Sequence, residues 1–600
     1  MADRILIPCI FAALCWSCAQ QGSPTGGPRD ETSPVVLKCE PANYSTQFIA
    51  KKTQITFDEY IVLDNVNQEL VVSPPMEKKP EVKLRKKTLF IEFEEALKDS
   101  TTYTFNFGSA IKDLHEGNKL LNYEYVFSTG DVLDSMSVRG TLMYAEDLSI
   151  PGEPFSIMLY DDLRDSVPIL DIPLYVGRSD DSGVYSVNNL KAGVYKVFAL
   201  KDGNYNFIFD LPTEEIGFLD SSLIVNAEFA KSLLEKGMNR DTVPPEPSVG
   251  MLLPETTDST SMEADSVMAE RPDYNSIYVD FLLFTEEVET QYITNDKRDD
   301  RRLIQLTFAR PLTDSFNYRF LNPEPVEVLE DFSSGKDSLN LWLRDSLDYK
   351  KDTLILELNY TVKDTAMQFV TQTDTLLLKY REKKTKQKKG SPGKEEEGLV
   401  ISTIKSKREV NLNSSLRLDL NVPLHSIHDS LIRLYHIPDS VEIPLAFTVR
   451  TDEEIPTRGW IDVAWESASK YRLLLLPGAL TSIYPMDHDT LDVSFQSRDI
   501  EYYGQILLTM EGVHNPVIIQ LINKESVVHQ LIVDQNGRYD FSYLLPQEYR
   551  IKFIHDLNQN GKWDTGNYMK KQQPEPVEFV PKPITVRSNW DHDVTMILKK

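Results

Sequence analysis

Cysteine is scarce in this chain: it occurs four times in 600 residues, at Cys9, Cys15, Cys18 and Cys39. Three of the four lie close to the amino terminus, so a mature domain held by several disulfides is excluded. Glycine is also sparse, with 26 residues, and none is spaced as a nucleophile elbow, a dinucleotide-binding turn or a phosphate-binding loop. The chain lacks these marks of enzyme chemistry, and we expect no enzyme.

Positive charge is in short supply as well. Lysine and arginine total 64 against 92 aspartates and glutamates, which gives a net charge of -28 at pH 7. A surface of this sign repels phosphate backbones, so nucleic acid is not an expected partner. The chain does contain 41% hydrophobic residues, with 27 Tyr and 26 Phe. This is the range of a globular protein, and its aromatic content favours strands.

The apolar run at the amino terminus, Ile5 to Ser17, is shorter than the roughly 20 residues that span a bilayer. It follows Arg4 and ends in a small residue directly before Cys18, a pattern typical of a bacterial lipoprotein signal peptide. We therefore predict a signal peptide at residues 1–18, with lipid on Cys18 as the attachment to the membrane. Residues 19–30 are rich in Gly, Pro, Ser and Gln, which predicts a flexible tether.

Segments in which apolar and polar residues alternate recur along the rest of the chain, and loops rich in Pro, Asn, Asp and Gly separate them. A period of two indicates half-buried strands. We predict an all-β chain of tandem β-sandwich domains.

Four segments near the start of the strand-rich region also carry a family resemblance. They are residues 55–60 (ITFDEY), 103–108, the Asp-x-x-Glu-Gly-Asn motif at 113–118, and Phe-Ser-Thr-Gly at 127–130. The region resembles the S-layer-type bacterial Ig-like domain found near the amino terminus of Bacteroidota lipoproteins. The resemblance implies a structural domain without catalytic residues, in an outer-membrane lipoprotein. Residues 19–22 carry no acidic side chain, which leaves both the periplasmic and the cell-surface face open.

Two distant regions repeat one pattern without a gap. At an offset of 354 positions, Gly183 aligns with Gly537, Tyr195 with Tyr549, and an Asp/Asn-rich loop follows in both copies. An internal repeat of this kind indicates two copies of one module. The pattern resembles the prealbumin-like sandwich of carboxypeptidase regulatory-like and adhesin-stalk domains, which implies an accessory fold.

The expected organisation places two linkers between the sandwiches. Pro, Glu, Ser, Thr and Asp dominate the first linker, and seven Lys or Arg residues fall between positions 381 and 394 of the second. The expected domains are Ig-like at 31–131, prealbumin-like at 132–228, a linker at 229–275, Ig-like at 276–380, a linker at 381–397, Ig-like at 398–499 and prealbumin-like at 500–600.

The strongest chemical motif is the loop that follows the repeated strands, with the spacing Asp-x-Asn-x-Asn-x-x-x-Asp. Oxygens at positions 1, 3, 5 and 9 can converge on Ca²⁺ if the loop curls. Position 12 lacks the bidentate Glu of an EF-hand, which indicates a weak calcium site, and a simple Asx turn is the alternative. The candidate ligands are Asp202, Asn204, Asn206 and Asp210 in the first copy, and Asp556, Asn558, Asn560 and Asp564 in the second.

The functional prediction is a non-enzymatic, lipid-anchored cell-envelope protein that acts as a multi-domain structural or binding scaffold. Its partner would be an envelope protein or a glycan. One alternative is an adhesin or glycan-binding surface lipoprotein that uses loop aromatics such as Trp563. A third is a hydrolase with a hidden carboxylate pair, because carboxylate separation is a three-dimensional property.

Overall fold

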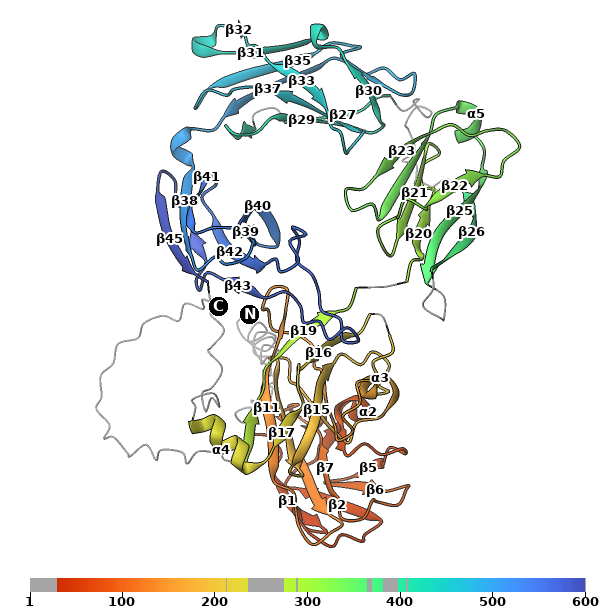
Figure 1. Ribbon diagram of the computed structural model, residues 1–600, viewed down its shortest axis with the longest axis vertical. Helices are drawn as coiled ribbons and strands as arrows, with labels where there is room; N and C mark the ends of the chain where they lie inside the picture. Colours follow the sequence, from red (N-terminus) through yellow and green to blue (C-terminus); the bar gives the residue numbers. More distant parts are fainter. Residues whose placement is uncertain are drawn as a thin grey trace, which may run out of the picture. The chain divides into compact units, whose positions relative to one another are not determined.

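The computed structural model describes residues 30–211, 213–235, 275–287, 290–363, 369–380, 398–405 and 408–598. Nearly all regular structure in these residues is β-strand (Figure 1), which confirms the all-β prediction of tandem sandwiches. They form two compact units, the first ending at Phe284 and the second comprising residues 145–148 and the chain from Thr285 onward. Cys18 and the basic linker at 381–397 lie outside the described residues.

The first sandwich forms because strands with alternating burial place one face on a common core. In β2, for example, Ile55 and Phe57 are buried while their neighbours are not. One sheet has the order β1 (Val36–Glu40), β2 (Lys52–Phe57), β6 (Thr88–Glu92), β5 (Glu81–Arg85), and the facing sheet has the order β10 (Glu124–Ser128), β7 (Thr102–Asn106), β4 (Val71–Ser73). The short strands β3 (Ile61–Leu63), β8 (Ile111–Asp113) and β9 (Lys119–Leu120) form a third sheet, and α2 (Val66–Glu69) precedes β4.

The second sandwich is one continuous sheet path folded around its own core. Its order is β13 (Tyr175–Arg178), β12 (Ser156–Tyr160), β15 (Gly193–Leu200), β16 (Glu215–Phe218), β19 (Phe281–Thr285), β11 (Met136–Tyr144), β14 (Val184–Leu190). Beside this path, β17 (Leu223–Val225) pairs with β15 and β18 (Ser276–Tyr278) pairs with β11. The helices are α3 (Val167–Leu170) and α4 (Ala227–Glu235).

The boundary expected between the second and third sandwiches, at residue 276, is wrong. Strands β18 and β19 pair in parallel with β11, and their buried residues Ile277, Phe281 and Leu283 belong to the second core. Residues 227–235, expected to lie mostly in the linker, form α4. The alternation at 277–283 correctly indicated strands, but it carried no information on which core they join.

The close approach of these strands depends on Gly140 of β11. A Cβ at this position would lie 1.7 Å from the carbonyl oxygen of Val279. The backbone N–H of Val279 donates to the Arg139 oxygen at 2.7 Å, and the Tyr185 hydroxyl donates to the Val279 oxygen at 2.7 Å. Residues 276–284 therefore close the second sandwich.

The third sandwich begins with β20. It consists of a four-stranded sheet packed face to face with a three-stranded sheet. The first sheet has the order β20 (Ile293–Lys297), β21 (Leu303–Phe308), β24 (Ser338–Leu343), β23 (Val328–Phe332), and the second has the order β22 (Asn317–Phe320), β25 (Thr353–Lys363), β26 (Phe369–Lys379). Helix α5 (Ser346–Tyr349) starts at Asp345, whose side chain caps it by accepting from the Leu347 N–H.

The fourth sandwich is also built from facing sheets. They are β27 (Ile401–Ser402), β29 (Leu416–Leu420), β34 (Arg458–Asp462), β33 (Thr448–Thr451), and β28 (Glu409–Val410), β37 (Leu491–Ser497), β35 (Lys470–Leu475), β31 (Ile432–His436), β32 (Ile443–Pro444), with β30 (Leu424–Ile427) paired to β36 (Leu480–Ser482). Three short 3-10 turns, η2 (Asp429–Leu431), η3 (Pro438–Ser440) and η4 (Ile500–Tyr502), lie between or after these strands.

The fifth sandwich repeats the second strand by strand. Its strands are β38 (Gly504–Glu511), β39 (Val517–Asn523), β40 (Ser526–Val533), β41 (Gly537–Leu544), β42 (Glu548–His555), β43 (Val577–Phe579), β44 (Ile584–Thr585) and β45 (Asp591–Ile597). β38 pairs antiparallel with β41 and parallel with β45, as β11 does with β14 and with β18 and β19. The Tyr195 and Tyr549 hydroxyls each donate to a carbonyl four residues upstream. The predicted internal repeat is confirmed.

Candidate functional site

The two predicted loops occupy the same place in the two copies of the module. The first follows β15 and runs from Asp202 to the start of β16; the second follows β42 and runs from Asp556 toward β43. Each therefore connects the same pair of antiparallel strands. The structure brings all four predicted side chains of each loop together in one small turn.

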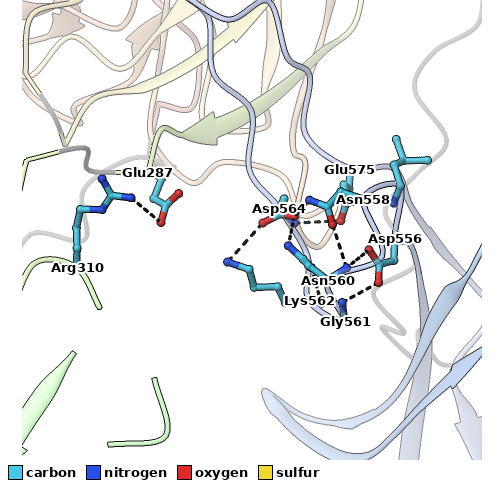
Figure 2. A network of polar contacts seen from close by, with 10 residues as sticks. Glu287, Arg310, Asp556, Asn558, Asn560, Gly561, Lys562, Asp564 and Glu575 are labelled. Atoms are coloured by element: carbon cyan, nitrogen blue, oxygen red, sulfur yellow. Dashed lines mark hydrogen bonds and ion pairs between the residues drawn. The ribbon is translucent and has the colours of Figure 1, made fainter. Parts of the chain in front are cut away.

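The first Asp of each loop holds the turn through backbone N–H groups. The two oxygens of Asp556 accept from the Asn560 N–H at 3.0 Å and from the Gly561 N–H at 2.8 Å (Figure 2). In the first copy the Asp202 oxygens accept from the residues at the same positions, Asn206 and Phe207, at 3.1 and 2.7 Å. Each carboxylate thus replaces the carbonyl partners that these N–H groups lack in a tight turn.

The last Asp of each loop receives the side-chain amides. Asn558 and Asn560 both donate Nδ2–H to the Asp564 carboxylate, the latter at 2.6 Å (Figure 2). The first copy repeats this arrangement, with Asn204 and Asn206 donating to Asp210 at 3.2 and 2.9 Å. Positions 3, 5 and 9 are therefore joined across the turn in both loops.

A buried glutamate that the sequence reasoning missed ties the two ends of each loop together. Glu575, 4% exposed, accepts from the N–H of Leu557 at 2.7 Å and from that of Asp564 at 3.1 Å. Glu214, 2% exposed, accepts from Gly203 at 3.1 Å and from Asp210 at 3.1 Å. These are the second and ninth positions of the loop in each copy.

The missed glutamates have no common spacing, which is why an ungapped alignment does not reveal them. Glu214 follows its loop's first Asp by 12 residues and Glu575 by 19. The usable signal is the strand that follows, because Glu214 comes just before β16 and Glu575 just before β43. Aligning strands instead of residue numbers would have found the pair.

Negative charge accumulates in the second loop. Burial raises the pKa of the Glu575 carboxyl; hydrogen bonds from the Leu557 and Asp564 N–H groups oppose this, and the carboxylates of Asp564 and Asp556 add to it. Lys562 forms an ion pair with the loop, with its Nζ 3.5 Å from Asp564 (Figure 2). Its side chain is 66% exposed, so this ion pair contributes little.

In the structure, each loop is an Asx turn whose polar side chains are hydrogen-bonded within the loop, with the amide nitrogens facing the last Asp. A half-turn of the Asn558 and Asn560 amides exchanges oxygen for nitrogen at nearly the same positions. The oxygens would then converge with those of Asp564 and would give up the bonds that they accept from the Asn560 and Lys562 N–H groups at 3.1 and 3.0 Å, which is favourable only with a cation between them. Among the described residues, no group of three or more His, Cys, Asp or Glu side chains is arranged to hold a metal ion. Calcium at these loops, which also offer amide oxygens, stays a prediction.

The two loops differ at the positions that adopt left-handed backbone. Positions 4 and 6 have positive φ in both copies: 60° and 59° at Tyr205 and Phe207, against 62° and 78° at Gln559 and Gly561. Glycine adopts this conformation without cost, whereas a residue with a side chain is disfavoured there by about 1 kcal/mol. The first loop therefore keeps aromatic side chains at two positions where its copy has none.

The Asp-x-x-Glu-Gly-Asn motif of the first sandwich has a structural role. Asp113 is 1% exposed and accepts from the N–H groups of His115, Glu116, Gly117 and Asn118 at 2.6–3.1 Å. Burial opposes ionisation, but these four bonds outweigh it and lower the pKa of the Asp113 carboxyl from 3.8 to about 2. The motif is a turn organised around one ionised carboxylate.

Trp563, the candidate for an exposed sugar-stacking ring, is half-buried. Its indole N–H donates to the Glu575 carbonyl at 3.0 Å, and the ring packs against the cluster of Ile518, Ile554 and Val577. The tryptophan thus anchors the loop on this small apolar cluster.

Comparison with known families identifies the first sandwich. Residues 30–129 match the bacterial Ig-like domain family, which confirms the Ig-like prediction for this region. The match covers about a sixth of the chain and describes that domain alone. The prealbumin-like resemblance of the second and fifth sandwiches stays a prediction. No curated protein matches the chain.

Solved structures align with long parts of the chain but at low similarity. The S-layer protein rSbsC(31-844) is 10% identical over 92% of this chain and 67% of its own, with a TM-score of 0.13. The major pilin subunit BcpA of Bacillus cereus is 11% identical over 77% and 99%, with a TM-score of 0.14. Native alpha-2-macroglobulin from Escherichia coli, domains MG0-NIE-MG1, is 10% identical over 44% and 94%, with a TM-score of 0.18. Scores this low carry no functional argument.

Within the described residues, no helix has the length and apolar character needed to cross a membrane.

Proposed function

We propose that this protein is a lipid-anchored scaffold of the bacterial cell envelope, a non-enzymatic chain of β-sandwiches that holds or presents a binding surface. The observation that carries the proposal is that consecutive sandwiches within each unit are docked on one another through buried and hydrogen-bonded contacts. Domains that are docked on one another keep a fixed relative geometry, whereas domains joined by flexible linkers do not.

The contact between the first two sandwiches is built at the edge strand β4. The buried Ser73 hydroxyl oxygen accepts from the Val176 N–H of β13 at 3.1 Å. Arg178 donates to the Gln68 carbonyl at 2.5 Å, and its Nη1 lies 3.6 Å from the Glu69 carboxylate. An edge strand that is covered in this way is protected from pairing with another chain.

A second group of contacts lies between β10, β7 and β14. Asn188 donates to the Glu124 carboxylate at 3.0 Å, and Asn189 donates to the Thr104 hydroxyl at 3.0 Å. Burial raises the pKa of the Glu124 carboxyl, while the amides of Asn188 and Asn106 oppose the rise. Polar groups buried between domains fix one relative geometry, because any other leaves them unpaired.

The second unit has contacts of the same kind. Between the third and fourth sandwiches, the Tyr484 hydroxyl, 4% exposed, donates to the Leu343 carbonyl at 2.8 Å, and Trp342 packs in the fourth core. Between the fourth and fifth, the Tyr503 hydroxyl accepts from the Leu412 N–H at 3.0 Å. The Tyr503 ring packs edge to face on the ring of Tyr543, with 5.5 Å between the ring centroids.

Attachment to the outer membrane through Cys18 is part of this proposal and rests on the signal-like segment before it. Metabolic labelling with an alkyne-bearing fatty acid tests it. The account predicts a labelled band for the wild-type chain and none for Cys18→Ala; equal labelling of the two, or none in either, contradicts it. Cys39→Ala is the control, because Cys39 is half-buried and its Sγ lies 3.2 Å from the Tyr123 hydroxyl.

Trypsin treatment of intact cells separates the two membrane faces. The seven basic residues between 381 and 394 supply cleavage sites between the third and fourth sandwiches. Cleavage on intact cells supports a surface scaffold, whereas cleavage only after the outer membrane is opened supports a periplasmic one.

Weak calcium binding at the two Asp/Asn loops is the remaining part of the proposal. Two observations support it. The spacing of Asp556, Asn558, Asn560 and Asp564 is the same as that of the corresponding residues in the first copy, and negative charge is in excess around Glu575. Calcium would neutralise that charge and fix the loops without taking part in a reaction.

A further inference from the structure

The first unit contains a cavity of about 320 Å³ between its two sandwiches. One wall is the segment from α2 through β4 to β5, and the other is the first Asp/Asn loop with the start of β12. Strands β4 and β5 are edge strands of the two facing sheets. The cavity is therefore the open end of the first sandwich, closed over by the loop of the second.

The floor of the cavity is apolar. Leu70, Val72, Met76 and Val82 line it, and all four are partly buried side chains that pack against the first core. Phe207 of the opposite loop also lines the cavity. A concave apolar site of about 300 Å³ or more between two domains is a common location for a small ligand.

The loop wall keeps its aromatic side chains in an unfavourable backbone conformation. Tyr205 and Phe207 both line the cavity and both have left-handed φ, where the second copy has Gln559 and Gly561. The same turn forms without them, so folding of the loop does not require aromatic residues. Strained residues of this kind are concentrated at binding sites.

Cations stand at the rim of the cavity. Arg178 and Lys201 line it but are shared with carboxylates: Arg178 with Glu69 at 3.6 Å, and Lys201 with Glu153 at 3.2 Å. Lys79 also lines the cavity, and among the described residues no carboxylate forms an ion pair with it. The lining carboxylate of Asp202 is occupied by the two N–H groups of its own loop. The rim thus offers one uncommitted positive charge.

We propose that this cavity binds a small amphipathic anion. The apolar body of the ligand lies against Met76 and Phe207, and the anionic group of the ligand pairs with the ammonium group of Lys79. This site adds a ligand to the scaffold and does not depend on how the chain is anchored.

Fluorescence titration of the purified, unlipidated chain with 8-anilinonaphthalene-1-sulfonate tests the proposal. Phe207→Gly is expected to weaken binding at least about tenfold, because the aromatic wall is lost. Tyr44→Gly is the matched control: Tyr44 is an exposed aromatic residue of the same unit, also with left-handed φ, 58°, and it does not line the cavity. Equal binding by the two variants would overturn the site.

The charge requirement is tested with a neutral dye of the same shape, N-phenyl-1-naphthylamine. Lys79→Gln is expected to weaken the sulfonate about tenfold and to change the neutral dye less than twofold, since only the former makes a charge-assisted contact. Lys78→Gln, the exposed neighbour outside the cavity, is expected to change neither. Equal loss of both dyes in Lys79→Gln would overturn the anionic assignment.

Misfolding is separated from loss of binding by thermal melting. Glycine fits the left-handed φ of 59° at position 207, so Phe207→Gly is expected to melt no lower than the wild type while it loses the dye. A lowered melting temperature together with increased dye fluorescence would mean that the aromatic ring serves packing alone, and the proposal would fail.

Discussion

The loops at 202–214 and 556–575 are the same turn in two settings. Both fold around an Asp that accepts two backbone N–H groups and a buried Glu that accepts two more. They differ in the side chains on left-handed backbone, aromatic in the first and Gln and Gly in the second. The aromatic copy lines a cavity against a docked neighbour. The acidic residues therefore determine the turn, while the residues at positions 4 and 6 can differ according to what surrounds each loop.

The largest effect is expected from removing the buried glutamate. Glu575→Ala leaves the Leu557 and Asp564 N–H groups without their acceptor, which should cost the fifth sandwich about 3 kcal/mol. Glu214→Ala should cost the second sandwich a similar amount, since Glu214 accepts from the corresponding positions. Hydrogen exchange at the released amides, measured by mass spectrometry on the whole chain, reads each loop separately. If only one copy responds, the two turns are not equivalent.

Exchanging the residues at position 6 should have opposite effects in the two copies. Gly561→Phe places a side chain at φ 78° and is expected to destabilise the fifth sandwich by about 1–2 kcal/mol. Phe207→Gly relieves the same strain and is expected to leave the second sandwich no less stable. Chemical denaturation of the two variants checks this. A loss above about 2 kcal/mol in Phe207→Gly would mean that packing of the ring outweighs the strain.

Calcium should produce a smaller shift. At a concentration ten times a millimolar dissociation constant, binding stabilises the folded state by about 1.4 kcal/mol. We expect calcium to raise the melting temperature slightly, magnesium to raise it less, and Asp556→Ala with Asp564→Ala to remove the contribution of the second loop. A calcium shift that is unchanged in this double variant would leave the Asx turn as the whole explanation of the second loop.

The smallest effect is a pH dependence of the second loop. The pKa of Glu575 is raised above 4.5 in the folded state, so the folded state holds its proton to higher pH than the unfolded state does. Its contribution to stability is full below pH 4.5 and is lost as pH rises through the folded-state pKa. Asp113 has the opposite sign: its stabilisation is full above pH 3.8 and is lost as pH falls toward 2.

These two groups can be separated by substitution. Opening free energies from hydrogen exchange at the Leu557 amide, corrected for the intrinsic rate, should decline above pH 4.5 in the wild type and stay flat in Glu575→Gln. A rise with pH in the wild type would contradict the assigned direction.

Much of the fold was predictable because its signals are local. Alternation such as that around Ile55 and Phe57 gave strands, and the offset between Tyr195 and Tyr549 gave two copies of one module. What failed was long-range pairing. Strands β18 and β19 join β11 from more than 130 residues away, and nothing in their own alternation indicates the partner. A hairpin can be predicted from the tight turn between its strands, whereas no such local signal identifies the partner of a parallel strand.

The two turns were predictable to the same extent, whereas calcium binding at them stays a prediction. The Asp and Asn spacing correctly located both turns, since their side chains bond within a few residues. The two glutamates that close the loops could not be predicted, because the connection before them differs in length between the copies. The cavity could not be predicted either, because it is lined partly by the first sandwich, and the loop sequence does not indicate that contact.

Docking of neighbouring sandwiches into one geometry can be tested by a pulsed electron paramagnetic resonance distance measurement in the first unit. Spin labels at Leu37 of the first sandwich and Val194 of the second occupy exposed positions, with Cys39→Ser to remove the competing thiol. We expect a single narrow distance distribution that broadens when Arg178 and Asn188 are both replaced by Ala. A broad distribution in the parent chain would contradict docking and leave a string of independently moving domains.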